Sequence, residues 1–299
     1  MSFRPFHLHV HDTQRLSPHF MRITLSGDPL RHFRAAGPFF DQRIKVLFPT
    51  SRGTLPLLDP AADWYAQWSV LPEEERGHMR SYSVRDLYDS GQQRFLVIDF
   101  VLHLQDGATG PAAQWAHAAR PGDPIIIVGP GVDTPAGAGI EFLPGDASAI
   151  TLVGDETAVP AMARILSDLP DTARGSVVVE VPTDADILPV TAPESMRITW
   201  LPRQGQAPGQ RILEHFGTHG VEPAAEDLVW ETPQFSSSGE QLDDRGGVDK
   251  LSPVRSYFWI AGESGMVTSL RRHLVRGLEV ERSQVAFMGY WKQGVSMRG

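Results

Sequence analysis

The sequence predicts an N-terminal antiparallel barrel of six strands, followed by a C-terminal α/β domain built on a parallel sheet. The first half contains short segments rich in β-branched and aromatic residues, bounded by Gly, Pro and Asp, as in small barrels. In the second half strand-like and helical segments alternate, which favours a parallel sheet covered by helices. A stretch dense in Gly, Pro and Ala separates the halves and marks a domain boundary.

The expected elements follow from these patterns in chain order. The strands of the barrel are expected at 7–11, 22–25, 44–48, 80–85, 95–102 and 124–128, with one helix at 111–119. In the second half we expect strands at 150–153, 177–181, 198–201, 257–261 and 285–288, and helices at 159–169, 209–216 and 266–275. The domains are then 1–134 and 150–299, joined by a linker at 135–149, and 232–250 is expected to be a polar excursion.

Composition excludes several classes of function. The 299 residues include 27 Lys and Arg against 36 Asp and Glu, a net charge of −9, which argues against a nucleic-acid binder. There are no cysteines, so disulfides, thiolate zinc sites and cysteine-ligated iron–sulfur clusters are impossible. No apolar run approaches the ~20 residues of a membrane span, and the N-terminus lacks an apolar signal region. We therefore expect a cytoplasmic protein without stable membrane insertion.

The first candidate site is the strand Arg80-Ser81-Tyr82-Ser83-Val84-Arg85. Alternation places Arg80, Tyr82 and Val84 on one face of the strand and Ser81 and Ser83 on the other. A flavin needs an aromatic wall, a donor near its ring edge and a cation near its phosphates, and this strand offers all three. The alternative is an exposed strand of mixed composition.

The second candidate is the strand end Asp99–His103, followed by Thr109, Gly110 and a helix that begins at Pro111. Thr109 is a candidate N-cap, and Pro111 suits the first turn of a helix. Unpaired N–H groups and the helix dipole make such a helix start a binding site for pyrophosphate. The alternative is a helix start that is only capped, with a histidine satisfied internally.

Two further candidates lie at strand ends in the second half. The run Gly154-Asp155-Glu156-Thr157-Ala158 follows a buried strand, and Ala261-Gly262-Glu263-Ser264 follows another. Ligands of open α/β sheets bind at the carboxyl ends of strands, and Gly262 would allow close approach of a planar ring. The alternatives are a helix cap by Asp155 or Thr157 and, further on, a solvated helix face at Arg271 and Arg272.

Together these motifs resemble the siderophore-interacting protein family of FAD-containing ferric-siderophore reductases, within the ferredoxin–NADP reductase-like superfamily. The resemblance runs from about Phe6 to Gly294 and includes the tail Gly289-Tyr290-Trp291-Lys292-Gln293-Gly294. It implies a flavin-binding barrel and a nicotinamide-binding α/β domain. It also implies a monomer that uses FAD, takes electrons from NADH or NADPH and reduces the Fe³⁺ of a ferric siderophore for iron acquisition.

The resemblance assigns roles residue by residue. The flavin would be held by Arg80, Tyr82 and Ser83, and its pyrophosphate by residues 110–113. The nucleotide would contact residues 154–157, Gly262 and Glu263, and the anionic siderophore would contact Lys45. The full set expected to bind the cofactors is Arg80, Tyr82, Ser83, Asp99, Val101, His103, Thr109, Gly110, Pro111, Ala112, Asp155, Glu156, Thr157, Ala158, Gly262 and Glu263. Because flavin converts two-electron into one-electron chemistry and the iron arrives chelated, we expect no catalytic acid, base or nucleophile and no protein metal ligand.

Departures from the family pattern leave alternatives open. Many relatives carry a cation after Gly-Pro at the end of the barrel, whereas this chain has Gly129-Pro130-Gly131-Val132. A general NAD(P)H:flavin reductase or diaphorase and a non-enzymatic siderophore carrier are the other readings. The choice of nucleotide is also open, since Arg203 suits a 2′-phosphate and Glu180 a free ribose diol.

Overall fold

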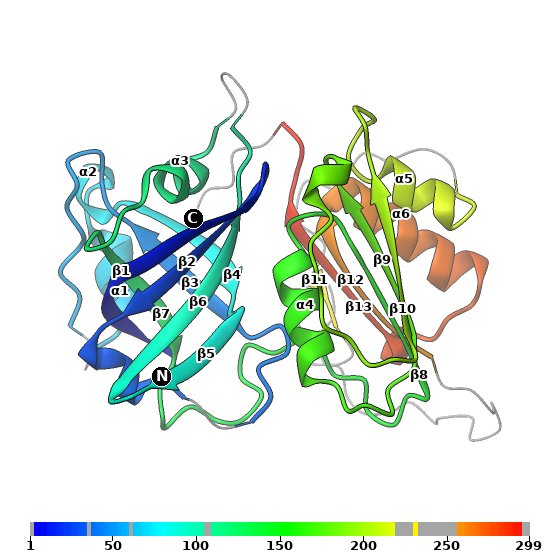
Figure 1. Cartoon of the computed structure of the whole chain (residues 1–299), viewed down its shortest axis with the longest axis horizontal. Coiled ribbons are helices and arrows are strands. Elements are labelled where there is room, and N and C mark those ends of the chain that lie inside the picture. Colours follow the sequence, from blue (N-terminus) through cyan, green and yellow to red (C-terminus); the bar gives the residue numbers. More distant parts are fainter. Residues whose placement is uncertain are drawn as a thin grey trace. The chain divides into compact units, whose positions relative to one another are not determined.

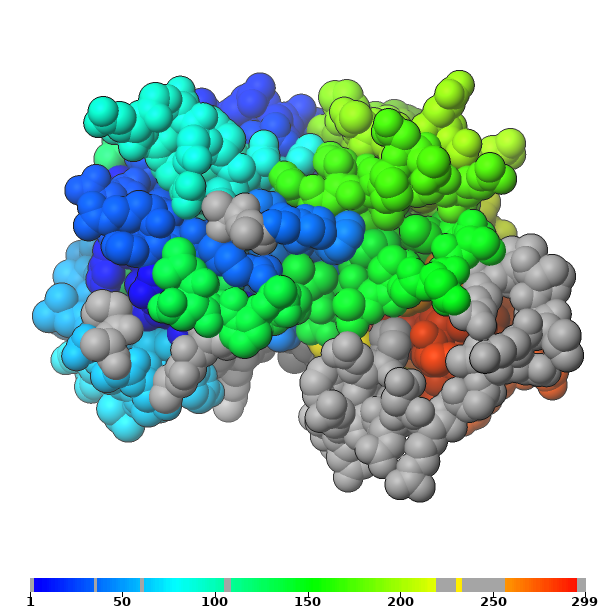
Figure 2. Space-filling view, turned by 90° about the horizontal axis from the view of Figure 1, so that it is seen from below, coloured from blue at the N-terminus to red at the C-terminus, as the bar shows by residue number. Residues whose placement is uncertain are grey.

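The computed structural model describes residues 3–34, 37–59, 62–104, 109–218, 230–232 and 256–294, which carry the colours of the bar in Figures 1 and 2. The chain divides into two compact units, Met1–Ile140 and Glu141–Arg298. Each unit is built around its own sheet.

The N-terminal unit is a curled antiparallel sheet (Figure 1). Within the described residues it has seven strands in the order β4-β3-β7-β1-β2-β6-β5. Their bounds are β1 Phe3–Ser17, β2 Phe20–Ser26, β3 Arg43–Phe48, β4 His78–Ser83, β5 Asp86–Ser90, β6 Gln93–Val101 and β7 Pro124–Pro130. The helices of this unit are α1 Trp64–Val70, α2 Glu73–Arg76 and α3 Pro111–Ala118, with a short 3₁₀ turn at Asp28–His32.

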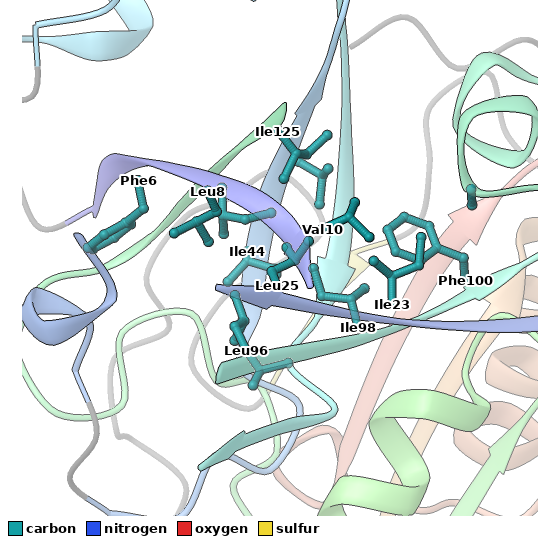
Figure 3. Packing of buried hydrophobic residues seen from close by; sticks show 14 of the residues in the cluster. Phe6, Leu8, Val10, Ile23, Leu25, Ile44, Leu96, Ile98, Phe100 and Ile125 are labelled. Carbon is teal, nitrogen blue, oxygen red and sulfur yellow. The ribbon is translucent and has the colours of Figure 1, made fainter. Parts of the chain in front are cut away.

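The core of this unit follows from alternation along the strands. In β1, Phe6, Leu8 and Val10 are buried, while the three histidines between and after them are exposed. Figure 3 shows these side chains converging with those of β2, β3 and β6. Each fully buried side chain of this kind contributes ~1.5–3 kcal/mol, which makes the sheet a rigid support for its edge strands.

A second, smaller cluster covers the other face of β3, β4 and β7. Leu47, Met79 and Val128 pack there with Trp68 of α1, in the excursion between β3 and β4. Helix α1 begins at Asp63, whose Oδ1 accepts hydrogen bonds from the N–H groups of Tyr65 (3.0 Å) and Ala66 (3.1 Å). This face of the sheet is therefore partly closed by the chain itself.

The C-terminal unit is a mainly parallel sheet in the order β10-β9-β8-β12-β13-β11 in the described part of the chain. Its strands are β8 Ala149–Gly154, β9 Gly175–Val181, β10 Met196–Pro202, β11 Trp230–Glu231, β12 Ser256–Glu263 and β13 Val285–Trp291. Its helices are α4 Val159–Asp168, α5 Gln210–His215 and α6 Ser264–Arg272, the last continuing as a π-helical turn at His273–Gly277. Only β11 is antiparallel to its neighbour among these described strands.

Helices cover both faces of this sheet (Figure 1). Val178 faces α5 and α6, whereas its neighbours Val177 and Val179 line a small apolar space beneath α4. Chain order changes direction between β8 and β12, so the topological switch point lies there. The turns after β8 and β12 therefore meet at one place.

The fold class is confirmed, and some elements differ from the prediction. The barrel sheet has a seventh described strand, β5, and helices α1 and α2 and strand β11 were not predicted. Of the excursion predicted at 232–250, Thr232 alone belongs to the described residues. No helix in the described ranges is long and apolar enough to cross a membrane. In the same ranges no group of three or more His, Asp or Glu side chains is placed to hold a metal ion.

Candidate functional site

The register of β3 against β4 sets the geometry of the first candidate site. Tyr82 lies opposite Ile44 and Arg80 opposite Val46, so both side chains share the face of the buried core. Lys45 lies opposite Ser81 and therefore belongs to the other face. The predicted alternation of Arg80 and Tyr82 against the serines is thus what the structure has.

Tyr82 is held by other aromatic rings. Its ring centroid lies 4.6 Å from that of Phe100 and 6.3 Å from that of Phe48, and both phenylalanines contact Trp115 of α3. Its hydroxyl makes no hydrogen bond with any described residue, and burial raises its pKa well above the ordinary value. Tyr82 is therefore a fixed, neutral phenol with a hydrogen-bond donor to spare.

Arg80 is a half-buried cation on the same face. Its Nη1 donates to the carbonyl of Met79 at 2.7 Å, and no described carboxylate pairs with it. Burial lowers its pKa, although an arginine stays protonated at any physiological pH. A cation that is partly desolvated and lacks an acidic partner favours binding of an anion such as a phosphate.

The start of α3 offers N–H donors nearby in the same unit. Gly110 precedes the helix in an extended conformation, Pro111 occupies the first turn, and no side chain of the described residues caps this end. A Cβ added at Gly110 would meet nothing within 4 Å, so the backbone there is open to approach. Gln114 holds the preceding carbonyl of Thr109 at 3.3 Å, which fixes the entry into the helix.

These features fit FAD. A flavin dinucleotide requires an aromatic wall, a hydroxyl, a cation and a helix start, and here the last three have no competing side-chain partner among the described residues. Tyr82, Arg80 and the α3 start with Ala112 would hold it. Ser83 extends the set because its hydroxyl makes no hydrogen bond with a described residue, and half-buried Val101 and His103 lie at and beyond the end of β6.

Asp99 has a different environment from the one predicted for a cofactor contact. Its buried carboxylate receives two hydrogen bonds from Arg22, at 2.7 and 2.8 Å, and lies 3.6 Å from Arg85. Its side chain is thereby engaged across β2 and β6. Arg22 was not among the predicted site residues, although it lies directly opposite Asp99 and both belong to predicted strands.

Lys45 also lies away from the face that carries Tyr82. Its Nζ donates to the hydroxyl of Ser81 at 2.8 Å, and burial together with the neighbouring charge of Arg43 lowers its pKa. The apolar cluster around Leu47 and Val128 adjoins it on that face. The structure thus does not bring Lys45 and Tyr82 to the same face of the sheet.

In the C-terminal unit, Asp155 is the centre of the switch point. Its buried carboxylate accepts hydrogen bonds from the N–H (2.9 Å) and hydroxyl (2.5 Å) of Thr157, the N–H of Glu263 (2.7 Å) and Nε1 of Trp291 (2.8 Å). Burial and the adjacent charge of Glu156 raise its pKa to about 7, against the effect of these hydrogen bonds. The ends of β8, β12 and β13 are joined through this one side chain.

Glycines at this point make room for the protein itself. A Cβ on Gly262, whose φ is +143°, would lie 2.7 Å from Oδ2 of Asp155. A Cβ on Gly154 would lie 2.5 Å from the Cβ of Ala158, the buried residue that precedes α4. The space expected at Gly262 for a planar ring is therefore taken by the Asp155 carboxylate.

The remaining carboxylates of this edge are also paired internally. Glu263 caps α6, with Oε2 accepting from the N–H groups of Gly265 (2.6 Å) and Met266 (3.0 Å). Arg203 donates two hydrogen bonds to Glu156, at 2.6 and 2.7 Å, and one to Glu180 at 3.1 Å. Arg203 and Glu180, predicted as competing contacts for the nucleotide, thus bind each other.

Further along α6, Arg271 donates to Glu231 of β11 at 2.6 Å. It is not the solvated cation that the sequence allowed. Trp291 and the Glu156–Arg203 pair were missed as well. The sequence signal for Trp291 was its place in the tail Gly289–Gly294, which carries the family resemblance and lies beyond the strand predicted at 285–288.

Comparison with known proteins agrees with this fold and with the two-unit organisation of the chain. The family model for the siderophore-interacting FAD-binding domain matches residues 9–134, and that for the siderophore-interacting protein matches 147–294. The first match confirms the expected FAD cofactor. A solved structure, a siderophore utilization protein from T. fusca, superposes with a TM-score of 0.71 at 26% identity, covering 99% of this chain and 95% of that one.

Two curated relatives align over most of the chain. The ferric vibriobactin reductase ViuB of Vibrio cholerae is 31% identical over 93% of this chain and 86% of its own length. The NADPH-dependent ferric-chelate reductase of Escherichia coli is 31% identical over 93% of this chain and 89% of its own, in agreement with a nicotinamide donor. The chain belongs to the siderophore-interacting protein family.

Proposed function

We propose that the protein is a ferric-siderophore reductase that uses FAD and takes its electrons from NAD(P)H. The observation that carries the proposal is that Arg80 and Tyr82 lie on the same face of β4. The same unit holds the start of α3, which no described side chain caps. Two relatives that reduce ferric chelates, according to their names, support the acceptor. The product is Fe²⁺, which the hard anionic oxygens of a siderophore hold less tightly than Fe³⁺.

In this proposal the residues of the chain bind FAD and position it, and they do not take part in the chemistry. FAD, when bound, supplies the exchange between two-electron and one-electron chemistry. Arg80 would offset the charge of the pyrophosphate, the amides at the start of α3 would donate hydrogen bonds to it, and Tyr82 would offer its hydroxyl and one edge of a ring fixed by Phe48 and Phe100. No side chain is required to move a proton at the iron, because the chelate only gains an electron.

A second candidate is a reductase of the same superfamily that passes electrons to free flavin or to a redox protein. The position of Lys45 favours it, because Lys45 is bound to Ser81 on the face opposite Tyr82. A siderophore contact by Lys45 then needs the ligand to reach both faces at the β4 edge of the sheet. A carrier without activity is the third candidate.

The deciding experiment follows the flavin spectrum of FAD-loaded protein without oxygen. NADH or NADPH is added first, then a ferric hydroxamate siderophore with a chromogenic Fe²⁺ chelator. We expect bleaching by the nucleotide and recovery of the flavin absorbance as the Fe²⁺ complex forms. Bleaching that persists with the siderophore but ends with free flavin or ferricyanide supports the second candidate. Absence of bleaching with either nucleotide and any acceptor supports the carrier.

A further inference from the structure

Four buried carboxylates stand at the carboxyl edge of the C-terminal sheet. Asp155 and Glu156 follow β8, Glu180 lies near the end of β9 and Glu263 ends β12. Nucleotides in open α/β sheets bind at this edge, next to the switch point between β8 and β12. The pKa of Asp155 is raised to about 7, so a phosphate placed here at neutral pH mainly meets the negative charge of Glu156, Glu180 and Glu263.

One cation is built into this cluster. The guanidinium of Arg203 makes three hydrogen bonds to Glu156 and Glu180, and its side chain is 11% exposed. The two carboxylates raise its pKa further above the ordinary value. For Arg203 to bind a phosphate it would have to leave Glu156 and Glu180, and these would remain buried without a cation.

The N-terminal end of α6, a place where phosphates often bind, is also filled. Oε2 of Glu263 takes the N–H groups of Gly265 and Met266, and its Oε1 takes that of Gln293 at 3.3 Å. An incoming phosphate would have to displace this carboxylate. The start of α6 is therefore satisfied by the protein's own anion.

Two other arginines of this unit lie near acids. Arg271 of α6 pairs with Glu231 at 2.6 Å, whereas Arg211 of α5 makes an exposed contact of 3.5 Å with Glu214, and its buried Nε has no hydrogen-bond partner among the described residues. Glu180 further binds the N–H groups of Gly209 (2.8 Å) and Arg211 (3.0 Å), so it too is unavailable to a ribose hydroxyl. Discrimination between nucleotides then depends on repulsion rather than on a ribose contact.

The geometry points to NADH as the electron donor, in preference to NADPH, because this acidic edge repels a 2′-phosphate and withholds Arg203 from it. The inference rests on the proposed function, whose donor it specifies. A 2′-phosphate carries about −1.5 to −2 charges at pH 7, by analogy with a phosphorylated hydroxyl. The ribose diol of NADH is neutral and escapes this repulsion.

The test is a binding measurement that requires no turnover. FAD-loaded protein is titrated calorimetrically with NAD⁺, NADP⁺ and the fragment 2′,5′-ADP. We expect NAD⁺ to bind at least tenfold more tightly than NADP⁺, and the fragment to show no binding at millimolar concentration. Equal or tighter binding of NADP⁺ overturns the inference, as does absence of NAD⁺ binding.

A variant tests the cause. Glu156→Gln removes one negative charge and part of the restraint on Arg203, so NADP⁺ affinity should rise about tenfold while NAD⁺ affinity changes less than twofold. Glu194→Gln removes the same charge from an exposed position just before β10, with no arginine partner among the described residues, and should leave the ratio unchanged. An unchanged ratio in folded Glu156→Gln protein overturns the inference.

Should Glu156→Gln fail to fold, the wild type supplies the same information through ionic strength. Salt screens repulsion, so the affinity for NADP⁺ should rise relative to that for NAD⁺ as NaCl is raised from 20 to 300 mM. Over this range the screening length falls from roughly 20 to 6 Å. If the affinity for NADP⁺ instead falls relative to that for NAD⁺, a cation contacts the 2′-phosphate and the inference is overturned. Preferential NAD⁺ binding without siderophore reduction leaves the inference standing and removes the proposed acceptor instead.

Discussion

The indole Nε1 of Trp291 donates a 2.8 Å hydrogen bond to the carboxylate of Asp155, which lies 136 positions earlier in the chain. The same carboxylate accepts a hydrogen bond from the N–H of Glu263. Strand β13 is thereby joined to β8 and β12, the two strands that flank the switch point. All the donors around Asp155 point at a buried oxygen pair. The protonation state of this one side chain therefore affects three strand ends at once.

Asp155 predicts a pH dependence of stability. Its folded pKa of about 7 lies above the ordinary 3.8, so the folded protein holds this proton more tightly than the unfolded chain does. The Asp155 contribution is therefore largest below about pH 4 and falls as the pH rises to about 7, by up to ~1.4 kcal/mol per pH unit. In urea unfolding between pH 5 and 7.5, Asp155→Asn should lose less stability than the wild type. The exposed variant Asp171→Asn serves as the control, and equal pH slopes for Asp155→Asn and the wild type would contradict the prediction.

Trp291→Phe removes one donor from Asp155 and keeps an aromatic ring. We expect a loss of ~1–3 kcal/mol in unfolding free energy at pH 8, since a buried acceptor loses a partner. The loss should shrink at pH 5.5, where Asp155 is protonated. Trp200→Phe, a half-buried tryptophan of β10, controls for the change in ring size. A pH-independent loss would show that packing, not the hydrogen bond, accounts for the effect.

Arg22→Ala leaves the buried Asp99 carboxylate with Arg85 as its remaining cation, at 3.6 Å. We expect destabilisation of about 3 kcal/mol, because breaking a buried pair exposes one charge to a low dielectric. Asp89→Asn breaks an Arg94 pair of similar geometry at the surface and should hardly change the unfolding midpoint. Chemical denaturation measures both, and equal effects would count against the burial argument.

Tyr82 separates cofactor binding from packing. Tyr82→Phe keeps the ring against Phe100 and removes the unpartnered hydroxyl, so FAD affinity should fall several-fold with stability nearly unchanged. Tyr82→Ala also removes the ring, and we expect a further loss of FAD affinity together with ~2–4 kcal/mol of stability. Flavin fluorescence titration and urea unfolding measure the two effects. Unchanged flavin affinity in both variants would argue against this strand as the cofactor site.

Lys45→Ala tests the acceptor. If Lys45 attracts an anionic siderophore, kcat/KM for the ferric siderophore should fall at least fivefold while ferricyanide reduction stays within twofold. Arg197→Ala, an exposed cation at the start of β10, is the matched control for charge. A parallel fall in both activities would exclude a siderophore contact by Lys45 and favour the second candidate function.

Much of the fold could be predicted because burial follows periodicity. Alternation along β1 and strand–helix alternation in the second half identify most elements directly. Strand β5 was missed because Asp86–Ser90 is short and lies at an edge of the sheet, and Leu87 and Tyr88 are its only apolar residues. Its signal was the turn at Gly91, whose φ is +61°.

The candidate site could be predicted only in part, for a related reason. Within one strand the period of two gives the shared face of Arg80 and Tyr82. Pairing between distant strands depends on register, and register places Lys45 on the opposite face and Arg22 beside Asp99. The carboxylates Asp155, Glu156 and Glu263 were located correctly at strand ends, but their internal partners lie far away in sequence.

The donor from Trp291 also bears on how the protein is made. A ribosome releases β8 and β12 before β13, so the Asp155 carboxylate lacks its indole partner until β13 emerges. A nascent chain truncated before this tryptophan leaves the C-terminal unit with an under-coordinated anion at its centre. We expect such a chain to unfold more readily than one that contains Trp291, because a buried acceptor has lost a donor.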